Sequence, residues 1–446
     1  MTSVKVFGAQ APLSTAVYLP ALGADYYRKA YLSAAKTRPF SSGFEPSDLA
    51  FWSGRSRLWN HHYALHSIGG HRVGSDTKEE FYHEDRQAFT LLGDSGGFQI
   101  GKGTLNGLKG LKKGITAEQA QSAWAANYDA KLWIIDWLQR YCNYAMTLDI
   151  PLWAMTVDGR NSPFHRCNAQ QITAMTVDNL RLIEENLDGT TQWLNVIQGS
   201  NAQDIAAWWG AVKWFRHGGW SLAGAAGWKG GLYNLLNTVL RMRDEAAFDP
   251  GQNWIHVLGV SQPRWFVFLT AIQQCLRRDN PELQISCDSA TPSIKGGGKD
   301  EYILPVHLGP DIKNWAFQFK TLNTYLHHAS PQCTEAAPLH SPVGTGLMMN
   351  DLAVNSNPLA GRRLDTIASQ IIVNHNMWVI LDAAERANAM AFGAQRQTLL
   401  PAQLSQALDV IVQAFTAQNW VDVLDQNRVV LDRAAPNEYT AAKTLI

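Results

Sequence analysis

The sequence has little charge, few cysteines and no excess of either charge sign. Only 17% of its 446 residues are charged, and 38 basic residues balance 38 acidic ones. A protein covered by a strongly basic surface is therefore excluded, although a local basic groove is enough to bind nucleic acid. The 46% hydrophobic fraction also excludes a mostly disordered chain.

The five cysteines are scattered, and no two of them form a Cys-x-x-Cys pair. This pattern is not a disulfide framework and fits a reducing compartment. The chain also lacks an apolar run of about 18 residues, the length that spans a membrane, and its N-terminal segment lacks the pattern of a signal peptide. We therefore expect a cytoplasmic protein without a membrane partner.

Short apolar runs that end in a small or polar residue, each followed by a helical stretch, recur along the chain. The six runs are residues 89–93, 145–148, 193–197, 220–223, 254–258 and 283–287. This alternation predicts βα units with a parallel sheet. At least six units favour a closed (β/α)8 TIM barrel over an open sheet. Such barrels carry their chemistry at the carboxyl ends of the strands.

The helical pattern extends beyond the last of these runs. Helices are predicted over residues 116–137, 167–186, 203–215, 311–328, 363–392 and 401–418. Residues 329–361 are rich in Ser, Pro, Asn and Gly and are expected to form an irregular insertion. We expect a barrel catalytic domain over 1–310, with the first strands within 1–75. A mostly helical C-terminal region over 311–446 is a candidate to complete the barrel.

Three aspartates follow apolar runs, where barrel strands are expected to end. Asp94 opens the hexapeptide Asp-Ser-Gly-Gly-Phe-Gln, Asp149 precedes Ile-Pro, and Asp288 follows Ile-Ser-Cys. Taken alone, each aspartate is equally well explained as a cap of a turn or helix, and the glycines after Asp94 as residues that adopt positive φ in a turn. Three in one barrel are harder to explain as independent caps. Two carboxylates supply a nucleophile and a general acid/base for glycosidic cleavage, and a third accepts N–H donors from a base edge.

The hexapeptide 94–99 is specific, and with it the chain resembles the tRNA-guanine transglycosylase superfamily. The resemblance continues in order through Val196-Ile197-Gln198-Gly199, Leu222-Ala223-Gly224-Ala225, Leu258-Gly259-Val260 and Cys287-Asp288. It covers roughly residues 85–300, with softer matches at 325–328 and 375–376. It implies a (β/α)8 barrel that exchanges guanine in a polynucleotide for a 7-deazaguanine base.

The resemblance also implies a role for each matched residue. Asp288 would attack C1′ and form a covalent glycosyl-enzyme, while Asp94 would protonate the leaving guanine and deprotonate the incoming base. Asp149 would bind the N1–H and 2-amino edge, and Gln198 and the Gly224 backbone would bind the 6-oxo group. Leu258 would pack on the base, and Ala225 would recognise the 7-substituent. The other implied substrate-binding residues are Ser95, Gly96, Phe98, Gly199 and Gly259.

The chain departs from the family at its zinc site. The three zinc-binding cysteines would fall near Lys313, Trp315 and Gln318, so only His375 remains as a ligand type. Because a structural zinc needs its soft ligands, we expect no cofactor. A substitute cluster would come from His327, His328, Cys333 and His340, which are alternatively solvated loop residues. The family's tRNA-docking and dimer surfaces lie near this module, so a homodimer and helper proteins both stay open.

The residues around the nucleophile are more similar to those of the DpdA-type enzymes, which insert 7-deazaguanine derivatives into DNA in bacteria and phages. Asp288 is followed by Ser-Ala-Thr-Pro, where tRNA enzymes have Pro-Thr-Arg. Lys295 and Lys299 enclose three glycines, which form either a phosphate-binding loop or a solvated linker.

This branch implies a pentosyltransferase that acts on DNA with a preQ0-like base, in the host cytoplasm if a phage encodes it. The alternatives are a tRNA-guanine transglycosylase without zinc, a non-catalytic nucleic-acid-binding subunit, and a carbohydrate glycosidase. Five tryptophans fall close together, at positions 208, 209, 214, 220 and 228. They predict either a helix packed on the barrel or a surface that stacks on unpaired bases.

Overall fold

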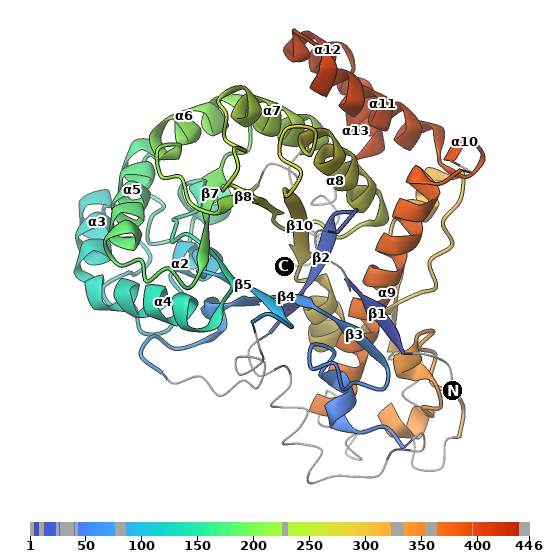
Figure 1. Cartoon of the computed structure of the whole chain (residues 1–446). Helices are drawn as coiled ribbons and strands as arrows, with labels where there is room; N and C mark the ends of the chain where they lie inside the picture. The colour runs from blue at the N-terminus through green and yellow to red at the C-terminus, as the bar shows by residue number, and fades with distance from the viewer. Residues whose placement is uncertain are drawn as a thin grey trace.

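In the computed structural model, eight parallel strands close into a barrel (Figure 1). The strands are β2 (Val17–Leu22), β4 (Tyr63–Ser67), β5 (Thr90–Asp94), β6 (Tyr144–Met146), β7 (Gln192–Gln198), β8 (Gly219–Ala223), β9 (Trp254–Val257) and β10 (Gln284–Ser289). β10 pairs with both β9 and β2, which closes the sheet. The predicted (β/α)8 fold is confirmed. The structure describes residues 4–8, 13–23, 26, 40, 43–75, 86–224, 231–322, 334–352, 364–394 and 396–436.

Helices surround the strands (Figure 1). They are α2 (Gly97–Lys102), α3 (Ala117–Ala126), α4 (Tyr128–Tyr141), α5 (Ala169–Glu185), α6 (Ala202–Val212), α7 (Gly231–Asp244), α8 (Pro263–Leu276) and α9 (Thr366–Phe392). The helix expected over 116–137 is two helices, broken at Asn127. The Asn127 side chain accepts the backbone N–H of Lys109 at 2.8 Å and donates to its carbonyl at 2.8 Å. The break thus anchors the preceding loop.

The barrel interior is filled by side chains. Alternate residues of the strands point inward and form a core cluster separate from the one between strands and helices. Its largest member is Trp254, whose ring centroid lies 4.3 Å from that of Tyr144. Each large apolar side chain buried in this way stabilises the fold by about 1.5–3 kcal/mol. A filled barrel has no central channel, so its chemistry is confined to the rim.

The segment after the barrel differs from the expectation. The helix predicted over 311–328 is wrong: β11 (Glu301–Ile303) and β12 (Phe319–Thr321) pair antiparallel, with a 3-10 turn (Ile312–Trp315) between them. Trp315 is buried, and its indole N–H donates to the Gly309 carbonyl at 2.8 Å. Burial of this ring and pairing with β11 hold the segment extended. Residues 323–333 lie outside the described residues.

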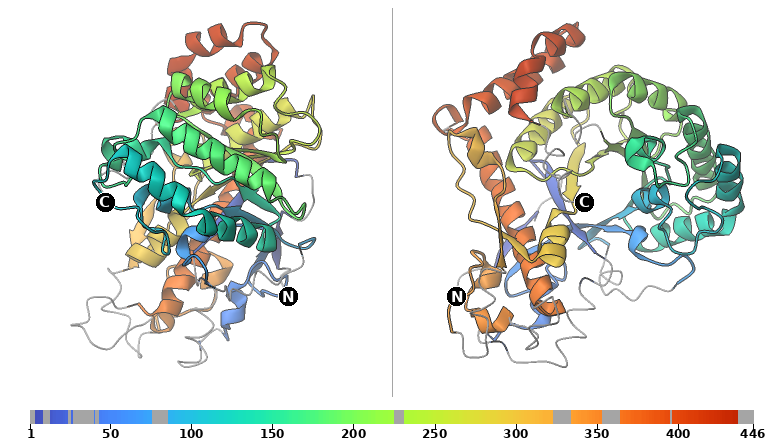
Figure 2. Two further views of the ribbon diagram at one scale, coloured as in Figure 1. Left: turned by 90° about the vertical axis from the view of Figure 1, so that its left-hand side faces the viewer. Right: turned by 180° about the vertical axis from the view of Figure 1, so that it is seen from behind.

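The C-terminal helices cover one side of the barrel. α9 packs against α8 and β11, and α11 (Ala402–Thr416) also contacts α8. The shorter helices α12 (Trp420–Gln426) and α13 (Arg428–Ala434) contact α7, and Figure 2 shows this group at the outer edge of the molecule. The remaining elements are α10 (Arg396–Leu399) and a parallel pair, β1 (Lys5–Phe7) and β3 (Trp59–His61). None of the described helices has the length and apolar character needed to cross a membrane.

Three of the five clustered tryptophans pack into the fold. Trp208, Trp209 and Trp220 are buried, and the Trp208 indole N–H donates to the Val196 carbonyl of β7 at 2.9 Å. Trp214 is 75% exposed but follows α6, at the amino end of the strands. Trp228 lies outside the described residues. The described part of the expected insertion, residues 334–352, contains 3-10 turns at Pro342–Gly344 and Met349–Leu352.

Candidate active site

Three carboxylates meet at the carboxyl end of the barrel. Asp94 ends β5, Asp288 lies near the end of β10, and Asp149 follows β6 by three residues. Burial raises the pKa of Asp94, and the charge of Asp288 raises it further. Burial raises the pKa of Asp149 to about 7, and the charge of Asp94 contributes to this rise. The aspartates therefore interact electrostatically across the rim.

Asp288 is held through one of its two oxygens. The Gly259 N–H donates to Oδ1 at 3.0 Å, from a backbone with φ of 78° that favours glycine. His256 Nε2 lies 3.3 Å from the same oxygen. Oδ2 forms no hydrogen bond within the described chain, and the residue is 8% exposed. Asp288 thus has one fixed oxygen and one oxygen available to react.

His256 belongs to a buried polar chain beneath Asp288. Its Nδ1 lies 2.8 Å from Ser286 Oγ, which also accepts the Trp254 indole N–H at 2.7 Å. An indole N–H only donates, so the serine hydroxyl is free to donate to His256 Nδ1. In the tautomer that accepts this proton, Nε2 carries the imidazole proton and directs it toward Asp288. His256 Nε2 forms no hydrogen bond within the described chain, so its 3.3 Å approach to Asp288 Oδ1 is a close polar contact.

Sequence reasoning missed His256 and Ser286. Both lie two residues before a predicted site residue, Leu258 and Asp288 respectively. Because side chains of a strand alternate between its faces, each shares the inward face of that site residue. The two also face each other in register across β9 and β10. The alternation of side chains along a strand, applied to the motifs at Leu258 and Asp288, would have predicted His256 and Ser286 as inward-facing residues.

Asp94 is positioned from two neighbouring strands. The Gly96 N–H donates to its Oδ1 at 3.1 Å. Ser67 of β4 stands opposite Asp94 in register, and a hydrogen bond from its hydroxyl lowers the pKa of the carboxyl. Burial outweighs both effects, so the pKa of Asp94 stays above its usual value. A carboxyl that keeps its proton to higher pH is suited to general acid catalysis.

Asp149 and Gln198 form a buried pair. The Gln198 amide donates to Asp149 Oδ2 at 2.6 Å, and the two residues are 4% and 7% exposed. Gly97, the first residue of α2, lies against the other oxygen, where a Cβ at this position would come 2.8 Å from Oδ1. Only glycine allows this approach. The pair offers carboxylate and amide groups side by side, as recognition of a heterocycle edge requires.

The other predicted substrate-binding residues differ in exposure. Ser95 is buried, and its hydroxyl donates to the Thr147 carbonyl at 3.0 Å. Phe98 is 52% exposed, with its ring 5.5 Å from that of Trp153. Gly199 and Gly224 follow β7 and β8 with positive φ, and Leu258 packs on the inner core. Ala225 lies outside the described residues.

Lys295 and Lys299 are not on an open loop. Residues Ser293–Gly298 form a π-helical turn, and a Cβ on Gly296 would come 2.8 Å from the backbone nitrogen of Val373 in α9. Lys295 pairs with Glu301 at 2.5 Å, with its ammonium 4.4 Å from the Phe319 ring centroid. Lys299 is half-buried at the end of the turn. This favours a packing role for the segment over the phosphate contact predicted for it.

The remaining zinc-ligand position does not fit a metal. His375 is fully buried, with Nδ1 2.8 Å from Ser341 Oγ and Nε2 3.0 Å from the Ile303 carbonyl. Burial lowers its pKa to about 4. Both ring nitrogens thus have protein partners. Within the described ranges, no group of three or more His, Cys, Asp or Glu residues is arranged as metal ligands. His327, His328 and Cys333 lie outside those ranges.

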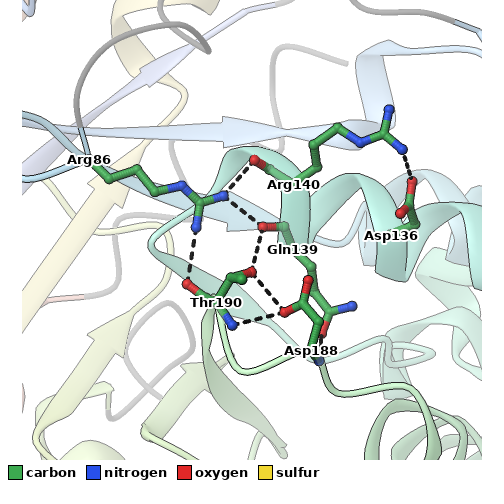
Figure 3. Close-up of a pocket in the computed structure, with 6 residues that line it drawn as sticks. All are labelled: Arg86, Asp136, Gln139, Arg140, Asp188 and Thr190. Atoms are coloured by element: carbon green, nitrogen blue, oxygen red, sulfur yellow. Dashed lines mark hydrogen bonds and ion pairs between the residues drawn. The ribbon is translucent and has the colours of Figure 1, made fainter.

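Figure 3 shows a pocket whose lining residues include Arg86 before β5 and Thr190 before β7, at the amino ends of the strands. It is lined by Arg86, Asp136, Gln139, Arg140, Asp188 and Thr190. Arg86 donates to the carbonyls of Gln139, Arg140 and Thr190, and the Thr190 hydroxyl donates to Asp188 at 2.7 Å. Because these groups satisfy one another at the amino ends of the strands, they stabilise the fold rather than bind a ligand.

No family model matches this chain, and no curated protein matches it. The function is therefore argued from the geometry of the rim and from the motifs that the rim carries. Of the predicted residues, Asp94, Asp149, Gln198, Gly259 and Asp288 are brought together at that rim.

Proposed function

We propose that this protein is a DNA-guanine transglycosylase, which exchanges guanine in DNA for a 7-deazaguanine base such as preQ0. The observation that carries the proposal is the meeting of Asp288, Asp94 and the Asp149–Gln198 pair at one end of the barrel. It supplies a nucleophile, a proton donor and a base-recognition pair within one electrostatically coupled group. The motif order described above supports the same assignment.

The chemistry is a double displacement at C1′. Asp288 Oδ2 attacks C1′ as the C1′–N9 bond breaks, and the bonding electrons leave with guanine. Asp94 donates its proton to the departing base. The incoming base then loses a proton to Asp94, its N9 attacks C1′, and the Asp288 carboxylate is released. The fixed Oδ1, held by Gly259, orients the attacking oxygen.

Recognition of the base falls to the Asp149–Gln198 pair. A carboxylate accepts both the N1–H and the 2-amino group of a guanine-like edge, while the Gln198 amide can turn from Asp149 to the 6-oxo group. The target nucleotide must leave its base stack before Asp288 can reach its C1′ atom. Phe98, exposed at the rim, offers an aromatic face beside the entrance.

The test is base exchange with purified protein. Labelled guanine or preQ0 is incubated with DNA or with tRNA, and the Asp288→Asn variant serves as the inactive control. Incorporation into DNA by the wild type alone supports the proposal. Incorporation into tRNA but not DNA assigns the site to the zinc-free tRNA alternative. No incorporation into either, with no covalent complex on DNA, overturns the transferase assignment.

A further inference from the structure

The connection between β5 and α3 has an unusual charge. Residues 95–116 contain four lysines and no acidic residue, in a chain whose charges otherwise balance at 38 against 38. We call residues 102–113, which hold Lys102, Lys109, Lys112 and Lys113, the lysine loop. All four lysines are exposed. A local concentration of one charge sign in a neutral protein marks a candidate surface for a polyanion.

The lysines of this loop differ from others in the fold. Lys5 pairs with Asp382 at 2.9 Å and Lys213 with Glu245 at 2.7 Å. By contrast, no lysine of the lysine loop makes an ion pair with any residue in the described part of the chain. Their charges are therefore not neutralised within the described fold and remain available to an external anion.

The lysine loop is anchored beside the candidate active site. It follows α2, which begins three residues after Asp94 at the carboxyl end of the barrel. Its backbone is held at Lys109 by the Asn127 side chain, and its Asn106 carbonyl accepts the Val73 N–H at 2.9 Å. A Cβ on Gly103 would come 2.9 Å from Pro163 in the loop after β6. These contacts fix the position of the loop without using any lysine side chain.

A cation and an exposed aromatic ring lie together on α2, between the lysine loop and Asp94 in the sequence. The Lys102 ammonium lies 4.3 Å from the ring centroid of Phe98, which is 52% exposed. Phe98 follows Asp94 by four residues, at the start of α2. Surfaces that bind unpaired nucleic acid combine such aromatic faces with cations that follow the phosphates. Arg72 and Arg160, both exposed on neighbouring connections, extend the basic surface.

We propose that the lysine loop is the docking surface for the phosphate backbone of DNA, next to the nucleotide that enters the barrel rim. The proposal deepens the proposed function and rests on it for the choice of DNA. It assigns to the lysine loop the phosphate contacts that the sequence predicted for Lys295 and Lys299. Charge complementarity carries it, because DNA presents a dense row of phosphates and the loop presents uncompensated ammonium groups.

The test measures DNA binding directly and needs no base exchange. A variant with Lys109, Lys112 and Lys113 changed to Gln is compared with a control that loses the same charge, with Arg181, Arg278 and Lys213 changed to Gln. Arg181 lies in the second half of α5, and Lys213 and Arg278 follow the ends of α6 and α8, so all three lie toward the amino end of the barrel. Arg181 and Lys213 also pair with Asp178 and Glu245. Binding of short labelled single-stranded DNA is measured over a series of salt concentrations.

The loop variant is expected to bind DNA about tenfold more weakly. The slope of log binding constant against log salt concentration should become shallower by about 2, because binding with fewer phosphate contacts releases fewer counterions from the DNA. The control variant should stay within about twofold of the wild type. Equal effects of the two variants, or tighter binding of tRNA than of DNA through the same lysines, would overturn the proposal. Binding through the loop without base exchange would support the docking surface while removing the proposed function.

Discussion

The imidazole of His256 and the carboxylate of Asp288 lie side by side on adjacent strands, with Nε2 3.3 Å from Oδ1. His256 is fully buried, and Ser286 fixes its other nitrogen. The Asp288 carboxylate therefore receives contacts at the same oxygen from a side chain and from the Gly259 backbone. Its second oxygen is the one to which we assign the nucleophilic attack. This relationship makes His256 a positioning residue.

Replacing His256 should slow the first covalent step. His256→Phe removes the polar group beside Oδ1, and loss of a polar neighbour at a buried carboxylate costs about 1–3 kcal/mol, or roughly 10- to 100-fold in trapping rate. His256→Gln retains an N–H donor and should recover part of this loss. The rate of glycosyl-enzyme formation is measured against pH. A purely structural role would lower the melting temperature of both variants and leave the pH profile unmoved.

Variants of the two aspartates with proposed catalytic roles should fail at different steps. Asp288→Ala removes the attacking oxygen, so no covalent complex with DNA should form in a denaturing gel. Asp94→Ala should abolish turnover because the leaving guanine receives no proton. Exchange at the wild-type rate in either variant would remove the role given to that residue.

Asp149 should make the fold less stable as pH rises. Its pKa is raised from 3.8 to about 7 in the folded protein, so the native state holds a proton that the unfolded state has lost. Unfolding therefore becomes easier as pH climbs through this window. Asp149→Asn should flatten the fall in melting temperature between these two pKa values. An unchanged slope in the variant would show that other groups cause the dependence.

Gly97 should not tolerate a side chain. A Cβ would lie 2.8 Å from Asp149 Oδ1, so Gly97→Ala should displace the Asp149–Gln198 pair and weaken base binding. Overpacking of this kind costs about 1–3 kcal/mol. Gly210→Ala in α6 is the matched control, since no atom lies within 4 Å of its Cβ position. It should raise stability by about 0.5–1 kcal/mol. Calorimetry and binding of free guanine compare the two.

The activity should not depend on zinc. Both nitrogens of His375 are engaged by Ser341 and Ile303, so this residue is unavailable as a ligand. Elemental analysis of the purified protein should find well below one zinc per chain, and a chelator should leave base exchange unchanged. One full equivalent of zinc lost together with activity would refute this expectation.

Six of the eight barrel strands and the three aspartates were predictable because an apolar run ends at a small or polar residue, while β2 and β4 were expected only within residues 1–75. Asp94 and Asp288 stand at such ends. The polar chain beneath Asp288 was not predicted, because His256 and Ser286 lie inside strands where an apolar residue is the ordinary choice. The residue pattern over 311–328 wrongly predicted a helix, because Trp315 is buried by a 3-10 turn and not on the face of a helix. Contacts distant in the sequence decide both features.

The strand that carries Asp288 is also the strand that closes the barrel. Asp288 on β10 stands in register with Leu19 on β2, from the opposite end of the barrel sequence. Pairings so remote along the chain form late and slowly during folding. Until β10 pairs with β9 and β2, Asp288 is not held across the rim from Asp94. The reactive centre that we propose therefore forms in the same event that closes the barrel, and a newly made or partly unfolded chain lacks it.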